Sequence, residues 1–211
     1  MSLQDSVELP NRKAMLLHVG QLMASLGSEL PVNPEKMADA NGVHVREVSF
    51  EDGGVVQAVM DELDCCFEDL EEVGLTKDFL RDKRGLAWSK GGKACVFIRA
   101  GLDPVTRRWV CAHELAHHLL GHVDGAACAV GDRYRAREGS ANWLAAQILV
   151  PQQWISLAVA ELGCWREGLA RLFGVRQCDI SARLAELGLT QRKMPDAPRG
   201  GSWVEFSIYD W

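Results

Sequence analysis

Hydrophobic and polar residues alternate along the first fifty positions with two periods, one typical of helices and one typical of strands. Residues 11–27 carry apolar side chains at intervals of three and four positions, which predicts an amphipathic helix. A short helix is expected at 34–41, because Asn33 and Pro34 supply a cap and a first-turn proline. Residues 43–50 alternate between apolar and polar side chains and predict a strand.

The segment 54–73 predicts a longer helix that is acidic on most of its surface. Its apolar residues are spaced by four and three positions, and most of its acidic residues fall on the other faces. Such an acidic face is typical of a solvated helix surface. The alternative is a docking site for a basic partner, such as the helix-turn-helix domain of a repressor. The apolar stripe consists of Val56, Met60, Leu63, Phe67 and Leu70.

The rest of the chain predicts a hairpin followed by helices. Two apolar segments within 85–99 flank Gly91 and Gly92, which indicates a β-hairpin. From Asp103 to about residue 188 the periodicity is helical, and a linker rich in proline and glycine then leads to a short strand expected at 203–209. The pattern therefore predicts an α+β fold, mainly helical with a small antiparallel or mixed sheet. The helical region is interrupted at 123–134 and near residues 151, 163 and 174.

Composition narrows the class of protein. The 211 residues are 47% hydrophobic and 25% charged, which argues against a disordered, collagen-like or coiled-coil chain. The net charge of −6 argues against a protein whose main role is to coat nucleic acid. No apolar run reaches the roughly 18 residues of a membrane span, and no secretory signal is visible. The seven cysteines form no regular framework and no CxxC pair, so we expect reduced thiols and a cytoplasmic location.

The motif that carries chemistry is an HExxH sequence at residues 113–117. Asp103 and Pro104 are expected to start the helix, so the motif falls well inside it. Residues four apart on a helix differ by only about 40° in direction, so His113 and His117 can bind one metal ion. Imidazole nitrogen suits Zn²⁺, which keeps an open position for water in catalytic sites. Glu114 points away from the ligands and can accept a proton from that water.

The alternative is an amphipathic helix whose two histidines are satisfied by hydrogen bonds in the core. Trp109, His113, Ala116, His117 and Leu120 form one helical stripe, which we expect to face the core. Burying two unpartnered imidazoles would be costly, and a metal ion removes that cost. This reasoning favours metal binding.

A second helix, ended by Pro151, offers a third ligand. Glu138 and Asn142 are four residues apart and share a face, so Glu138 can supply a carboxylate oxygen while Asn142 hydrogen-bonds a ligand imidazole. The alternative for Glu138 is an acidic residue stabilised by the dipole at a helix start. His122 follows His117 by five residues, which is a poor spacing for a third ligand. Tyr134 is a candidate donor to a developing oxyanion.

The sequence resembles the ImmA/IrrE metallo-endopeptidases. The resemblance is carried by residues 107–122 and 138–151, with weaker likeness at 31–50 and 85–99. It implies a zincin-like peptidase fold with zinc held by His113, His117 and Glu138, and with Glu114 as the catalytic glutamate. It also implies a protein substrate, a helix-turn-helix repressor whose cleavage relieves repression in a mobile element or a stress response.

Residues 166–185 resemble a helix-turn-helix, with Ala170, Gly174 and Ile180 at its small, turn and apolar positions. Its second helix would carry Arg176, Gln177 and Arg183 towards a DNA groove. Two positive charges are few for direct nucleic-acid binding. We favour a structural helix pair. Two alternative functions stay open, a DNA-binding regulator that uses these helices and a non-catalytic partner-binding or toxin–antitoxin component.

Three regions are expected along the chain. Residues 1–163 form the zinc peptidase-like domain, with an acidic helical insertion at 54–80. Residues 164–189 form the helix-turn-helix-like pair, and residues 190–211 form a linker and tail. No membrane association is expected.

Overall fold

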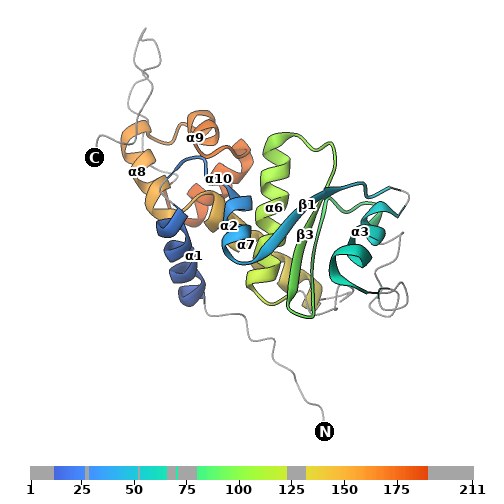
Figure 1. The fold of residues 1–211 in the computed structure, drawn as a ribbon. Helices are drawn as coiled ribbons and strands as arrows, with labels where there is room; N and C mark the ends of the chain where they lie inside the picture. The colour runs from blue at the N-terminus through green and yellow to red at the C-terminus, as the bar shows by residue number, and fades with distance from the viewer. Residues whose placement is uncertain are drawn as a thin grey trace.

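The computed structural model describes residues 12–26, 29–51, 53–65, 70, 80–122 and 132–189. Within these ranges the chain folds into a mainly helical body beside a small sheet (Figure 1). This arrangement confirms the predicted α+β class. The expected strand at 203–209 and the tail at 190–211 lie outside the described residues. None of the described helices is long and apolar enough to cross a membrane.

The first elements follow the sequence pattern closely. Helix α1 spans Arg12–Leu26, helix α2 spans Pro34–Ala40 and strand β1 spans Val43–Val48. The side chain of Asn33 accepts hydrogen bonds from two backbone N–H groups in the first turn of α2. This is the cap that the sequence predicts, and it satisfies donors that have no partner within the helix.

The sheet has three strands in the order β1-β3-β2, so β2 forms an edge. Strands β2 (Gly85–Lys90) and β3 (Lys93–Arg99) form the predicted antiparallel hairpin, while β1 pairs with β3 in parallel. Alternate residues of β3 enter two cores on opposite faces of the sheet, because side chains alternate along a strand. Ala94, Val96 and Ile98 pack on the helical side, and Cys95 and Phe97 pack towards α3.

Helix α3 spans Gly54–Leu63 and is shorter than the predicted helix at 54–73. It ends at Asp64, whose φ of 52° is left-handed and whose backbone N–H bonds the carbonyl of Met60. The predicted stripe is correct for Val56 and Leu63, while Phe67 lies outside the described residues. Met60 is only half-buried because the helix is rotated slightly towards its valine residues. The buried residues of α3 are Val55, Val56, Val59 and Leu63.

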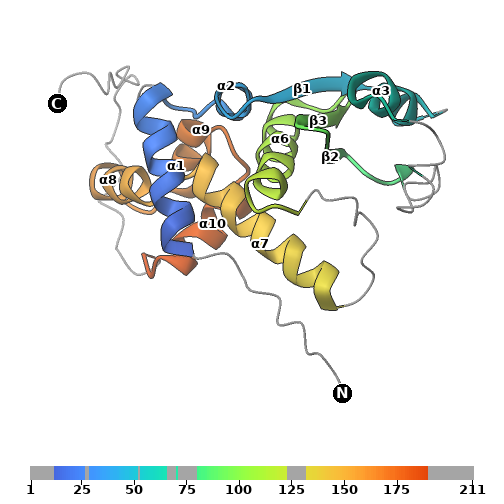
Figure 2. The ribbon, with the colours of Figure 1, turned by 60° about the horizontal axis from the view of Figure 1, so that its bottom comes forward.

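The helical half shows the predicted breaks near residues 151, 163 and 174 and forms one core, while residues 123–131 of the break expected at 123–134 lie outside the described residues. Buried residues of its helices α6, α7, α9 and α10 belong to a single hydrophobic cluster with β1 and β3. Figure 2 shows α7 running beside α6, with α9 and α10 packed next to them. The division of the chain at residue 163 stays a prediction. The helices are α6 (Pro104–Leu119), α7 (Asp132–Leu149), α8 (Gln152–Leu162), α9 (Arg166–Phe173) and α10 (Gln177–Glu186).

The DNA-binding alternative requires Arg183 to face a groove, and its burial contradicts that placement. Its side chain is buried and donates hydrogen bonds to the carbonyl of Val150 at 3.0 Å, to the side-chain oxygen of Gln147 and to the carboxylate of Glu186 at 2.7 Å. These contacts join α10 to α7. A guanidinium that is fully engaged inside the protein is not available to a phosphate backbone, which weakens the case for a DNA-binding regulator.

Replacing Arg183 with alanine is expected to lower the free energy of unfolding by about 3 kcal/mol, because the change leaves Gln147 and Glu186 without their buried partner. Urea unfolding followed by circular dichroism measures this loss. Arg171→Ala is the control, since Arg171 forms only an exposed ion pair with Glu167 and should cost less than about 1 kcal/mol. Equal stability of the two variants would contradict the structural role of Arg183.

Candidate metal centre

Helix α6 places the HExxH residues at the surface of a cavity. The helix starts after Asp103, whose side chain accepts hydrogen bonds from the backbone N–H groups of Val105 and Thr106, as predicted. The expectation that the stripe of His113 and His117 faces the core is correct for Ala116, which is buried, but not for the two histidines, whose side chains are 16% and 13% exposed and line the cavity. The sheet and the other helices cover the adjacent face instead. That buried face consists of Val110, Cys111, Ala112, Leu115 and Ala116.

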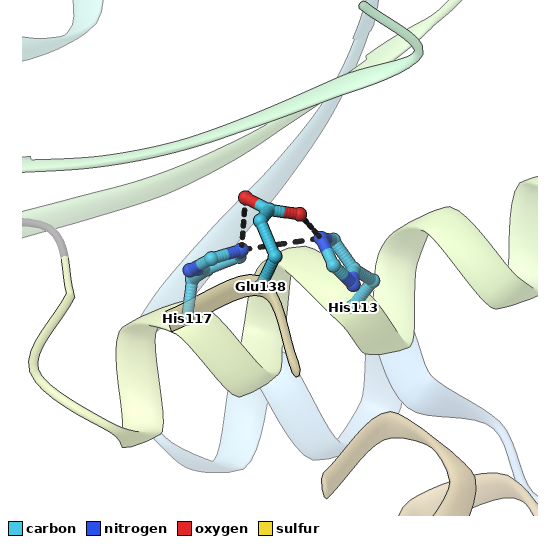
Figure 3. A group of neighbouring side chains, drawn as sticks. All are labelled: His113, His117 and Glu138. Carbon is cyan, nitrogen blue, oxygen red and sulfur yellow. Dashed lines mark hydrogen bonds and ion pairs between the residues drawn. The ribbon is translucent and has the colours of Figure 1, made fainter. Parts of the chain in front are cut away.

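Helix α7 brings Glu138 against the two histidines, as Figure 3 shows. The Nε2 atoms of His113 and His117 lie 3.1 Å apart. One carboxylate oxygen of Glu138 lies 3.3 Å from His113 Nε2, and the other lies 3.4 Å from His117 Nε2. Three side chains from two helices therefore direct their polar atoms at one point, and they form a group that could hold a metal ion.

These distances fit the donor set of a small divalent cation. Tetrahedral ligands with bonds of about 2.0–2.1 Å lie about 3.3–3.4 Å from one another, close to the separations seen here. The Nδ1 atom of His113 is buried and has no hydrogen-bond partner among the described residues. The alternative, in which hydrogen bonds in the core satisfy both histidines, therefore does not hold for His113.

The electrostatics of the group favour an ionised carboxylate. Burial opposes ionisation of Glu138, but its contacts with His113 and His117 outweigh burial and hold its pKa well below the ordinary value. Burial likewise opposes the charged form of His113, yet the contact with Glu138 and the charge of Glu114 raise the pKa of His113 above its usual value. Without a metal ion, the two acids therefore favour the protonated form of the histidine.

This shift predicts the pH dependence of metal binding. A proton on His113 must leave before its Nε2 can bind an ion, and the raised pKa means that the proton competes above the ordinary value of 6.5. Affinity is therefore full above the raised pKa and falls by about tenfold per pH unit as the pH drops through it. Calorimetric titration with Zn²⁺ between about pH 5.5 and about pH 8 measures this slope. An affinity that is constant over this range would contradict the assignment of His113.

Glu114 lies between α6 and the edge strand β2. Burial raises its pKa, although the nearby histidines oppose the shift. The strand approaches closely because residue 85 is glycine. A Cβ atom there would lie 2.5 Å from a methyl group of Val110 and 2.7 Å from the carboxylate of Glu114. Sequence reasoning missed Gly85, and its signal was a glycine at the start of a strand.

The cavity beside Glu114 has a volume of about 330 Å³. Asn142 is exposed on its wall and is among the contacts that raise the pKa of His113. The Tyr134 hydroxyl accepts a hydrogen bond from Lys83 Nζ at 2.8 Å. The roles expected for Asn142 and Tyr134 stay predictions. All six predicted site residues line this cavity, namely His113, Glu114, His117, Tyr134, Glu138 and Asn142.

His122 lies behind His117 and outside the group of three ligands. The Nδ1 atoms of the two rings are 3.2 Å apart, so His122 contacts the nitrogen of His117 that points away from Glu138. Burial, together with the nearby His117 and Arg137 side chains, lowers the pKa of His122 to about 4. A neutral His122 can accept a hydrogen bond from Nδ1 of His117 and leave its Nε2 for a metal. Sequence reasoning weighed His122 only as a ligand.

Comparison with known families matches residues 65–183 to the IrrE N-terminal-like domain, a family of peptidases, over more than half of the chain. The chain belongs to this family. The family resemblance seen in the sequence is thereby confirmed, and membership points to a metallopeptidase. The matched region of this IrrE-like domain begins just after α3, includes the hairpin and helices α6 to α9, and ends within α10.

The chain shows little sequence similarity to individual known proteins. No curated protein sequence matches the chain. One solved structure, a Mycobacterium tuberculosis transcriptional regulator, is similar with a TM-score of 0.49 and 16% sequence identity. The similarity covers 88% of this chain and 48% of the regulator, so the chain spans about half the length of that protein.

Proposed function

We propose that the protein is a zinc-dependent endopeptidase. The observation that carries the proposal is the convergence of His113, His117 and Glu138 from two helices, with Glu114 beside them. Two imidazole nitrogens and a carboxylate oxygen are a donor set typical of catalytic zinc. When bound, the ion would supply Lewis-acid chemistry, polarising a peptide carbonyl and lowering the pKa of a water.

Side chains of the protein carry out the proton transfers and orient the metal ligands. Glu114 accepts a proton from the attacking water and later returns it to the leaving amine. A carboxylate with a raised pKa suits this exchange, since it must hold the proton between the two steps. His122 orients His117 through the contact between their Nδ1 atoms.

An extended peptide is the substrate form that suits the cavity. Its wall includes residues 85–87 of β2, which is the edge strand of the sheet. An edge strand offers backbone N–H and C=O groups to a further strand, so a peptide can pair with β2 while its scissile bond lies near Glu114. From the family resemblance we take the substrate to be a helix-turn-helix repressor, cleaved to relieve repression.

The chemistry of the cysteines suits the cytoplasmic location that we propose. Cys95 and Cys111 are buried free thiols, and burial raises the pKa of each to about 12. Protonated, buried thiols are poor nucleophiles and poor partners for disulfide exchange. They have packing roles in a protein kept in a reducing compartment.

The test combines metal analysis with digestion of candidate repressors. Purified protein is analysed for bound metals and then incubated with helix-turn-helix repressors encoded next to it. We expect bound zinc and discrete cleavage products, which disappear after treatment with 1,10-phenanthroline and return when zinc is added. A stable complex with an intact repressor would favour the non-catalytic partner-binding alternative.

A further inference from the structure

The wall of the cavity is basic, although the protein as a whole carries a net charge of −6. Apart from the proposed site residues Glu114 and Glu138, Asp82 is the acidic residue on this wall among the described residues. Outside the proposed site residues, cationic side chains therefore outnumber acidic ones on this wall, whereas acidic residues outnumber basic ones in the chain as a whole. Its cationic residues are Lys83, Arg84, Arg137 and Arg176.

Two of these four cationic side chains, Arg176 and Lys83, form ion pairs or hydrogen bonds with other side chains of the protein. Arg176 forms a bidentate ion pair with Asp179, at 2.9 and 2.8 Å, and Lys83 donates to the hydroxyl of Tyr134. Arg84 and Arg137 have no carboxylate partner within the part of the chain that the structure describes. Arg107 shows the contrast, since it pairs with two glutamates away from the cavity.

Arg84 and Arg137 line the cavity from two segments that a hydrogen bond joins, the segment before β2 and helix α7. Arg137 directly precedes Glu138 on α7, and its charge is among the influences that lower the pKa of His122. The hydrogen bond between Lys83 and Tyr134 joins the segment before β2 to the same helix. Tyr134 and Arg137 are one turn apart on α7. Lys83, which is bonded to Tyr134, directly precedes Arg84 in the chain.

We infer that the substrate segment bound in the cavity carries acidic side chains next to the scissile bond, and that Arg84 and Arg137 bind them. The inference rests on the proposed function and names the class of its substrate. A guanidinium without a protein partner forms strong, bidentate hydrogen bonds to a carboxylate. Arg84 is exposed and Arg137 is half-buried, so a bound segment can reach both. Neutral or basic segments would leave both arginines without a partner.

The test uses full-length protein carrying Glu114→Gln, loaded with zinc, so that binding is measured without cleavage. Two fluorescent peptides of equal length are compared, one with Asp and Glu and the other with Asn and Gln at the same positions. The acidic peptide is expected to bind about tenfold more tightly by fluorescence anisotropy. Adding Arg137→Gln should remove most of this difference.

Arg135→Gln is the matched control, because Arg135 is exposed on the same helix and does not line the cavity. It should leave the preference for the acidic peptide unchanged. Equal binding of the two peptides, no binding of either, or an equal effect of the Arg135 and Arg137 changes would each overturn the inference.

Cleavage measurements separate this inference from the proposed function. The wild-type protein is incubated with a mixture of unfolded proteins, and the new chain ends are identified by mass spectrometry. Enrichment of Asp and Glu beside the cleaved bonds supports the inference, and cleavage without enrichment refutes it while the proposed function stands. Acid-selective binding without any cleavage would refute the peptidase and leave the binding preference intact.

Discussion

Replacing Glu114 with glutamine is expected to abolish peptide cleavage while leaving the metal content unchanged. Glutamine keeps the size and polarity of the side chain but cannot accept or return a proton. General acid–base catalysis contributes about 10²–10⁴-fold to a rate, so cleavage should fall at least about a hundredfold. The checks are the rate of repressor cleavage and the zinc content by elemental analysis.

Glu161→Gln is the control for this change, because Glu161 is exposed on α8 and far along the chain from the site. It should cleave at the wild-type rate. If Glu114→Gln kept full activity, its role as the proton carrier would be refuted. Loss of zinc from this variant would instead make Glu114 a ligand, contrary to the group formed by His113, His117 and Glu138.

Replacing His113 with alanine is expected to remove the bound metal and, with it, both cleavage and part of the thermal stability. The change leaves His117 and Glu138 as a two-residue site, which has too few ligands to retain zinc through dialysis. Zinc that binds only the folded protein stabilises it, so added zinc should raise the melting temperature of the wild type but not of this variant. Elemental analysis and thermal unfolding with and without zinc measure both effects.

His118→Ala is the matched control, since it removes an imidazole from the same helix without touching the group. His118 is half-buried, and burial lowers its pKa. No ion pair joins it to an acidic residue within the part of the chain that the structure describes. This variant should keep its zinc and its response to added zinc. Full zinc occupancy in His113→Ala would contradict the assignment of His113 as a ligand.

Local signals account for what the sequence predicted correctly. Asn33 and Asp103 cap their helices through contacts within three residues, and Gly91 and Gly92 both take the positive φ angles of the hairpin turn. The spacing of His113 and His117 places both rings on one side of any helix, whatever surrounds it. Such features depend on neighbours in the chain, so they can be read without knowing the fold.

Packing between distant segments decided the rest. From the sequence, Glu138 was only a hypothetical third ligand beside the two histidines. The packing of α7 against α6 brings the carboxylate oxygens of Glu138 within 3.4 Å of the histidine nitrogens. The rotation of α6, which turns the histidines towards a cavity, depends on where the sheet and α7 cover it. Periodicity shows that a helix has an apolar side, but the neighbouring elements determine which side is covered.

The amino-acid sequence by itself determined the helices, the hairpin, the family and the two imidazoles on one helix face. The tertiary structure alone decided the approach of Gly85 to Glu114, the contact of Glu138 with the two histidines and the burial of Arg183. The physical reason is the distance along the chain. Capping, turns and helical spacing act over a few residues, whereas each of these contacts joins segments that meet only when the core has formed.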